Sequence, residues 1–391
     1  MLPFTVSAQD PGSLARAGAL HTPHGVVPTP AFMPVGTAGT VKGIASWELE
    51  RLNPGMILAN TYHLLLRPGV DRIERLGGLH RVMAWAGPIL TDSGGYQVFS
   101  LAARRSLDED GVTFRSHIDG TAYRMTPESV VDVQARFGVD VAMVLDECLP
   151  YPAEPDEARA SVERTARWAV RSLDRALQIR SRAGAWDGGL FAIQQGSVDP
   201  GLRAWCTGQL AELPFDGFAI GGLAVGEPRP ILHRLIAASA PMLPAGRPRY
   251  LMGVGYPEDM LQGVANGVDL FDCVLPTRSA RTGKVFTSRG ELVIKNARFA
   301  DDPRPLDPAC DCPVCQRYSR AVLRHLFVSR EVTSVVLLSV HNLTYFLRLM
   351  REAREAIIAG RYVEFRSRVE TLRKSARHEP EDTGEEGEEE V

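Results

Sequence analysis

The sequence has little that would place the protein in a membrane or outside the cell. It starts without a basic segment followed by an apolar one, and we expect no apolar stretch to be long enough to span a bilayer. Only six of its 391 residues are cysteine, and Cys148, Cys206 and Cys273 are far apart, which favours reduced thiols over a disulfide framework. With 45% hydrophobic and 23% charged residues the chain can bury a full core. We therefore expect a cytoplasmic enzyme with one large domain and additions.

Basic residues are missing from the last thirteen positions, 379–391, which contain eight acidic residues. Such a like-charged run cannot bury apolar surface, so we expect the tail to be disordered. Removing those eight acids from a net charge of −3 leaves +5. The segment 276–330 holds eleven Arg and Lys against five Asp and Glu, which predicts a phosphate-binding surface.

A Cys-x-Cys-x-x-Cys run and a later histidine predict a metal site. The four residues are Cys310, Cys312, Cys315 and His341. Three thiolates and one imidazole complete the closed tetrahedral shell of structural zinc, with no position left for chemistry. Two alternatives stay open: the cysteines can be ordinary buried residues, and His341 can be a core histidine with His325 as the fourth ligand.

Eight short apolar runs separated by helical stretches favour an α/β fold, a (β/α)₈ TIM barrel. The predicted strands are residues 31–35, 56–60, 88–92, 141–146, 190–195, 218–221, 250–253 and 268–272. Because the active site of such a barrel lies at the carboxyl ends of its strands, the polar residues that end the runs should converge, namely Asn60, Asp92, Asp146, Gln195 and Asp272. A doubly wound sheet is the alternative, but no Gly-rich phosphate fingerprint opens the first helix.

Two insertions are expected. Segments 112–118 and 121–125 flank Asp119-Gly120, which predicts a β-hairpin with a type I′ turn, and Thr126-Pro127 predicts a helix start. The second is a zinc-binding subdomain, closed by a long helix over about 343–375. The predicted organisation is a catalytic barrel over 1–275, the zinc-binding subdomain with the closing helix over 276–375, and an acidic tail over 376–391.

The pocket residues suggest glycosyl chemistry. Asp92 precedes Ser93 and two glycines, which let a backbone approach a ligand closely, and Asp272 ends the last strand. Paired carboxylates suit an oxocarbenium-like centre, one as nucleophile and one to move protons. Either aspartate can instead be a helix N-cap. Asp146, Gln195 and the backbone of 221–223 can hydrogen-bond the edge of a purine, while Tyr96 and Met252 can pack on its two faces. Met252 can equally fill the core.

At these residues the chain resembles the bacterial tRNA-guanine transglycosylases, over about residues 5–370. The motifs that carry the resemblance are 91–99 (TDSGGYQVF), 114–120 (FRSHIDG), 193–197 (IQQGS), 221–227 (GGLAVGE), 271–278 (FDCVLPTR) and the zinc set. The resemblance implies a homodimeric zinc enzyme of queuosine biosynthesis. It would exchange the wobble guanine of the GUN-anticodon tRNAs for Asp, Asn, His and Tyr with 7-aminomethyl-7-deazaguanine (preQ1).

The resemblance also assigns roles to residues. Asp272 would attack the ribose C1′ and form a covalent tRNA intermediate, and Asp92 would be the general acid/base. Ser93, Asp146, Gln195 and Gly222 would hold the base, with Tyr96 stacked on it. The RNA contacts would be Gly253, Val254, Gly255, Tyr256, Pro257, Glu258, Asp259, Thr277, Arg278, Ser279, Ala280 and Arg281. One structural Zn²⁺ per subunit is expected, and Cys148 with 223–226 looks like the bacterial form that takes preQ1.

Two other classes of protein remain. A metal-dependent barrel hydrolase of nucleobases would need a His-x-His pair at an early strand end, where Phe32-Met33-Pro34 offers none. A non-catalytic RNA-binding module would explain the basic segment but not the aspartates.

Overall fold

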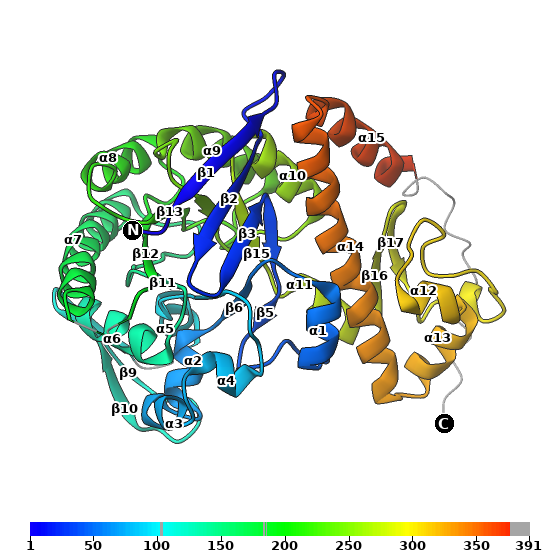
Figure 1. Ribbon diagram of the computed structural model, residues 1–391, viewed down its shortest axis with the longest axis horizontal. Coiled ribbons are helices and arrows are strands. Elements are labelled where there is room, and N and C mark those ends of the chain that lie inside the picture. The colour runs from blue at the N-terminus through cyan, green and yellow to red at the C-terminus, as the bar shows by residue number, and fades with distance from the viewer. Residues whose placement is uncertain (102–104, 183, 185, 376–391) are drawn as a thin grey trace. The chain divides into compact units, whose positions relative to one another are not determined.

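A computed structural model describes residues 1–101, 105–182, 184 and 186–375 (Figure 1). The predicted acidic tail therefore lies outside the described residues. Contacts divide the chain into two compact units. Unit 1 comprises residues 1–274 and 350–362, and unit 2 comprises 275–349 and the segment from 363 onward.

The predicted parallel barrel is confirmed. Its strands run in the spatial order β4-β15-β14-β13-β12-β11-β7-β6-β5, and every neighbouring pair is parallel. The two ends of this order, β4 (Ala31–Met33) and β5 (Val35–Gly36), are consecutive in the chain and separated only by Pro34. Proline has no N–H to donate, so it interrupts one strand into two, and the sheet closes on itself. The other strands are β6 (Ile57–Ala59), β7 (Ile89–Thr91), β11 (Val141–Met143), β12 (Gly189–Gln194), β13 (Gly217–Ile220), β14 (Arg249–Leu251) and β15 (Leu270–Asp272).

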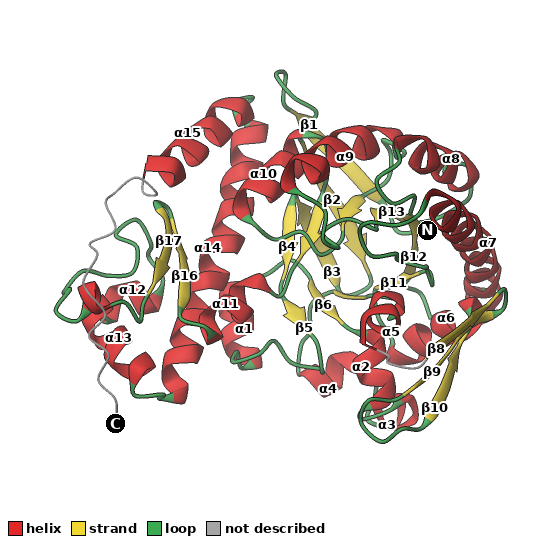
Figure 2. Cartoon of the chain, turned by 180° about the vertical axis from the view of Figure 1, so that it is seen from behind, coloured by secondary structure: helices red, strands yellow, loops and turns green. Residues whose placement is uncertain are grey.

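Helices surround the barrel strands, as Figures 1 and 2 show. They are α1 (Ser46–Leu52), α2 (Thr61–Leu66), α3 (Val70–Arg75), α4 (Leu79–Met83), α5 (Gly95–Leu101), α6 (Pro127–Phe137), α7 (Pro155–Arg180), α8 (Pro200–Leu210), α9 (Arg229–Met242) and α10 (Pro257–Ala265). The predicted start of α6 is confirmed, because the Thr126 side chain accepts from the backbone N–H of Ser129 in a capping box. Strands between such helices are buried on both faces, which is why they read as continuous apolar runs.

The hairpin insertion is present but differs from the prediction. Three antiparallel strands form it, β8 (Arg105–Asp108), β9 (Gly111–Arg115) and β10 (Ala122–Met125). The predicted type I′ turn at Asp119-Gly120 is wrong, because such a turn needs positive φ at both residues and only Gly120 has it, at 77°. Ser116 pairs with Thr121 instead, around a four-residue loop. Phe114 and Met125 of this sheet pack with Tyr62 and Trp168 in one buried cluster.

Strands that the sequence analysis did not identify form a further sheet in unit 1. They are β1 (Phe4–Gln9), β2 (Arg16–Thr22) and β3 (Gly25–Thr29). Residues 350–362 belong to the same unit: Arg354 donates to the carbonyls of Gly18 and Thr29, and the Tyr362 hydroxyl donates to the carbonyl of Leu261.

Unit 2 contains α11 (Leu275–Arg281), the hairpin β16 (Lys284–Thr287) and β17 (Gly290–Val293), the 3₁₀ turn Ala297–Phe299, α12 (Pro313–Arg317) and α13 (Arg320–Val328). The predicted single closing helix over 343–375 is wrong. Two helices occupy the region, α14 (Val332–Ile358) and α15 (Tyr362–Ser375). Gly360 lies between them with a φ of 66°, a left-handed conformation that ends the first helix.

Helix α14 also corrects the expectation that no apolar stretch could span a bilayer, since it is long and apolar enough to do so. However, 56% of its most apolar window is buried within the protein, as in a core helix. It is therefore weak evidence for a membrane segment.

Candidate active site

Asp92 directly follows β7 and is held by three donors. Its carboxylate accepts from the Asn60 amide at 2.5 Å, the Thr61 backbone N–H at 2.9 Å and the Gln97 amide at 2.8 Å. Because Asp92 accepts from the Thr61 N–H, it caps the first turn of α2. The sequence alone suggested instead that Asp92 could cap the helix that follows it. Burial, followed by a smaller effect from the negative charge of Asp272, raises the pKa of Asp92 to about 6.

Asp272 ends β15 and is only partly exposed. Its Oδ1 accepts from the Tyr250 hydroxyl at 2.6 Å and from the Gly253 backbone N–H at 2.7 Å. Among the described residues, no donor reaches Oδ2. Burial raises the pKa of Asp272, and the bond from Tyr250 opposes that shift. One oxygen is thus fixed while the other is available to react.

Asp146, Ser93 and Gln195 form a second connected group. The Ser93 hydroxyl donates to Asp146 Oδ1 at 3.1 Å, and the Gln195 amide donates to Oδ2 at 2.7 Å. Burial raises the pKa of Asp146 to about 6. Gly222 lies against this group with a φ of 64°, and a Cβ there would be 2.3 Å from Gln195 Oε1. A larger residue there would displace the Gln195 amide and adopt an unfavourable backbone conformation.

The two predicted stacking residues are less enclosed. Tyr96 lies in α5 with 51% of its surface exposed, and Met252 follows β14 and is partly exposed. Exposure of Tyr96 is compatible with a ligand-facing ring, and its stacking role stays a prediction.

The predicted RNA-contacting residues divide by exposure. Gly253, Tyr256, Arg278 and Arg281 are exposed, whereas Val254, Gly255, Pro257, Thr277, Ser279 and Ala280 are buried. Asp259 is also buried and accepts from Arg229 and His233, both at 2.6 Å, while Glu258 pairs with Arg229.

Several residues that build this site were not predicted from the sequence. Tyr250 is the first residue of a predicted apolar strand, and its hydroxyl contact with Asp272 arises only when β14 and β15 pair. Gln97 was visible in the motif after Asp92, but its amide contact was not. Glu227 accepts from the backbone N–H groups of Ala224 and Val225 and so holds the loop after β13.

In unit 2, the four predicted metal ligands come together. The ligand atoms of Cys310, Cys312, Cys315 and His341 all lie within 4.8 Å of one another. His341 Nδ1 lies 3.5 Å from the Cys312 sulfur and 3.2 Å from that of Cys315, and Nε2 can donate to the Phe286 carbonyl at 2.9 Å. This second bond leaves Nδ1 free to bind a cation. The cluster can therefore hold a metal ion, and His325 is not part of it.

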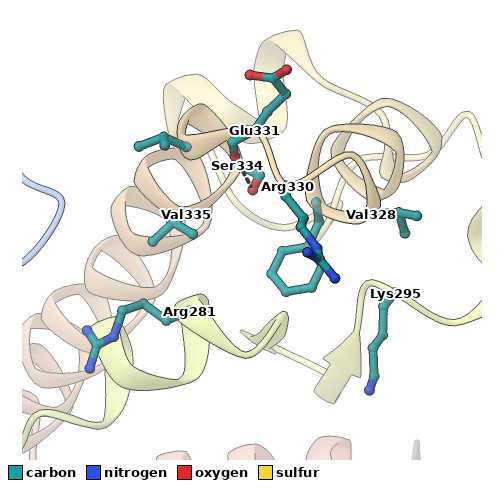
Figure 3. A pocket seen from close by; sticks show the side chains of 9 residues that line it. Arg281, Lys295, Val328, Arg330, Glu331, Ser334 and Val335 are labelled. Carbon is teal, nitrogen blue, oxygen red and sulfur yellow. Dashed lines mark hydrogen bonds between the residues drawn. The ribbon is translucent and has the colours of Figure 1, made fainter.

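A separate pocket of about 650 Å³ in unit 2 is lined by cationic and apolar side chains (Figure 3). Its lining residues are Arg281, Lys295, Phe327, Val328, Arg330, Glu331, Val332, Ser334 and Val335. In Figure 3 the Arg281 side chain points away from Lys295 and Arg330, so the three cations do not converge on one point. The pocket adds to the basic surface of unit 2 and contains none of the predicted base-binding residues.

A closed parallel barrel with buried carboxylates at its strand ends is the architecture of a barrel enzyme. A model of the family "Queuine tRNA-ribosyltransferase" matches residues 10–375. The chain is 52% identical over 369 residues to the queuine tRNA-ribosyltransferase of Nitratidesulfovibrio vulgaris (strain DP4), covering 94% of this chain and 96% of that protein. It is also 52% identical over 361 residues to the protein of that name from Granulibacter bethesdensis, covering 92% and 94%. The chain belongs to the queuine tRNA-ribosyltransferase family, which confirms the resemblance seen in its motifs.

Proposed function

We propose that this enzyme is a tRNA-guanine transglycosylase of queuosine biosynthesis, which exchanges guanine at the wobble position of GUN-anticodon tRNAs (Asp, Asn, His, Tyr) for preQ1. The observation that carries the proposal is the pair of carboxylates, Asp92 and Asp272, each held by neutral donors at the carboxyl ends of the barrel strands. Family membership supports the choice of tRNA as substrate.

Asp272 is the nucleophile in this proposal. Its Oδ2 attacks the ribose C1′, so a C1′–O bond forms as the bond from C1′ to guanine N9 breaks. The covalent tRNA intermediate retains a glycosidic bond, which means that no nucleotide cofactor has to supply energy. Tyr250 and the Gly253 N–H keep the carboxylate oriented throughout.

Asp92 moves the proton. The departing guanine takes a proton from Asp92, and the incoming base returns one to it as its nitrogen attacks C1′. A carboxyl group with a pKa of about 6 has both forms accessible near neutral pH, as this double role requires.

In this proposal the base is recognised by the connected group of Asp146, Ser93 and Gln195. Asp146 accepts from the N–H edge of guanine or preQ1, with Ser93, Gln195 and Gly222 beside it and Tyr96 and Met252 on the two faces. The residues around the pocket favour preQ1: Cys148 and the loop 223–226 are of the bacterial kind.

The metal of unit 2 is zinc in this proposal, one ion per chain. Three thiolates and one imidazole form the closed donor set of structural zinc, and burial of Cys310 and Cys312 shields it. His341→Ala should lose the ion and weaken the fold, because a structural site contributes directly to folding free energy. Atomic emission on the purified protein measures this, with His325→Ala as the matched control that keeps its zinc. Full zinc content in His341→Ala would contradict the ligand assignment.

The RNA is held by 253–259 and 277–281 in this proposal. Arg278 and Arg281 follow Asp272 by six and nine residues, and both side chains are exposed. We also propose a cytoplasmic homodimer whose chain is organised as a barrel over 1–275 and a zinc-binding subdomain over 276–375.

Incorporation of radiolabelled guanine into a GUN-anticodon transcript tests the function, with a transcript carrying adenine at the wobble position as the control. Label in the first transcript alone is expected. Release of free base without incorporation would indicate a hydrolase, and binding of tRNA without either reaction would indicate a non-catalytic RNA-binding module.

A further inference from the structure

Arg203, in α8, is a buried cation that the proposed reaction does not use. Its side chain is fully buried, and all of its bonds from the guanidinium go to backbone carbonyls. Nε donates to the Ser197 carbonyl at 2.8 Å, Nη1 and Nη2 donate to the Gly221 carbonyl at 3.1 Å each, and Nη2 also donates to the Gly222 carbonyl at 3.2 Å. Among the described residues, no carboxylate lies within ion-pair distance of Arg203. Burying a charge costs free energy, and here only carbonyl dipoles stabilise it. A role for the arginine that offsets this cost is therefore expected.

The three carbonyls belong to the two turns that carry base-binding residues. Ser197 lies two residues after Gln195, and Gly221 and Gly222 follow β13. The turn after β12 packs tightly on Arg203, because a Cβ at Gly196 would lie 2.7 Å from the Arg203 backbone nitrogen. Arg203 therefore joins the turns after β12 and β13.

Peptide geometry transmits this contact to the pocket side. In a trans peptide the N–H points opposite to the C=O of the same peptide plane. When Arg203 takes the carbonyls of Gly221 and Gly222, the N–H groups of Gly222 and Leu223 must point away from it. The Gly222 N–H accordingly lies near the Cys148 thiol, which borders Asp146 and Gln195. Burial lowers the pKa of Arg203 only to about 10, so the guanidinium stays charged at neutral pH.

We propose that Arg203 is a positioning residue for base recognition, which fixes the Gly221-Gly222 and Gly222-Leu223 peptides with their N–H groups turned away from the arginine, so that the turn after β13 keeps its place beside Gln195 and Asp146. The inference rests on the proposed function, because the base pocket is assigned there.

The test compares Arg203→Met and Arg203→Lys with Arg249→Met. Arg249 is a matched control: it is also buried, donates to the Leu243 carbonyl at 2.7 Å, has a pKa lowered to about 10 by burial, and begins β14 instead of touching the base-binding turns. The measurements are the Kd of free guanine by calorimetry, the KM values for guanine and for tRNA, and thermal unfolding.

Arg203→Met should weaken guanine binding by about ten-fold or more, since charge-assisted hydrogen bonds are lost, and leave the KM for tRNA within about two-fold. Arg203→Lys should recover part of the affinity, because an ammonium can reach fewer of the carbonyls. Arg249→Met should lower the unfolding temperature without changing the guanine Kd. If Arg203→Met does not fold, Arg203→Lys is used in its place. Its change in guanine Kd is compared with its change in the KM for tRNA in the same way.

Unchanged guanine affinity in a folded Arg203 variant would overturn the inference, as would an equal loss in Arg249→Met. Failure of the wild-type protein to bind guanine at all would instead contradict the proposed function.

Discussion

The two ends of the barrel hold aspartates in different surroundings. At the carboxyl ends of the strands, Asp92, Asp146 and Asp272 accept from amides, hydroxyls and backbone N–H groups, and within the described part of the chain no cation pairs with them. Directly before the strands lie Asp140, Asp216 and Asp269, all fully buried. Asp216 pairs with Arg180 at 2.8 Å and Asp269 with Arg16 at 2.5 Å, while Asp140 contacts the rings of His24 and His80.

The second set also follows a repeated pattern. Each of these aspartates precedes one strand and accepts the backbone N–H at the start of its neighbour: Asp140 from Ile89, Asp216 from Leu190 and Asp269 from Arg249. The carboxylates thereby join adjacent strands where the ladder begins. Asp216 and Asp269 pair with arginines and Asp140 contacts two histidines, so these three carboxylates link strands, whereas the aspartates at the carboxyl ends accept from neutral donors. The carboxyl ends are where TIM-barrel enzymes carry their active sites.

The largest effect is expected from a comparison of Asp272 with Asp269, which lies three residues earlier at the other end of β15. Asp272→Asn should abolish guanine exchange and the denaturant-resistant tRNA adduct, because the nucleophile is gone. Denaturing gel electrophoresis of enzyme incubated with tRNA measures the adduct. An adduct that persists in Asp272→Asn would refute the assignment.

Asp269→Asn, at the other end of β15, is the control. It leaves Arg16 buried and without its full carboxylate partner, so it should destabilise the fold by roughly 3–5 kcal/mol. The fraction that stays folded should still form the adduct.

Asp92→Ala should reduce exchange by at least about 100-fold while tRNA affinity is kept, because proton transfer is lost and the phosphate contacts are not. Exchange assays and filter binding at fixed salt separate the two effects. Normal turnover in this variant would contradict the acid/base role, and loss of folding would favour the capping role at α2.

A smaller effect is expected from pH through Asp146. Its raised pKa means that the carboxyl group is half protonated at about pH 6 instead of near the ordinary value of 3.8. Below about pH 6 the group loses its negative charge, so the KM for guanine should rise up to about ten-fold per pH unit, and Asp146→Asn should remove the dependence. A KM that stays constant between pH 5 and about 7 would argue against base binding by Asp146.

The smallest effect concerns unit 2. Arg281→Ala should weaken tRNA binding by a few-fold and reduce the dependence of log Kd on log salt by about one ion, since one phosphate contact is lost. Filter binding over a salt series measures the slope. An unchanged slope in Arg281→Ala would exclude Arg281 from the RNA surface. The control is Arg136→Ala, because Arg136 is paired with Asp71 and Glu74 in unit 1. This control variant should leave the salt dependence of tRNA binding unchanged.

Much of this protein follows from its sequence alone. The apolar runs predict eight strand positions because parallel barrel strands are buried on both faces, and the polar residues that end them predict the mouth of the pocket. The ligands Cys310, Cys312 and Cys315 are readable because metal coordination requires particular atoms at short spacing. Thr126 and Pro127 mark the start of α6 because capping is a local interaction.

Tertiary structure decided what depends on contacts between distant segments. Local periodicity does not show which oxygen of Asp272 is held by Tyr250, or that Asp92 caps α2. The aspartates before the strands pair with Arg16 and Arg180 from far along the chain, and Arg203 reaches three carbonyls in two turns. The choice between His341 and His325 was likewise settled by folding, because only His341 is brought within ligand distance of the cysteines. A side chain's partners depend on how the chain closes in space, whereas its propensity for helix, strand or capping depends mainly on its neighbours in sequence.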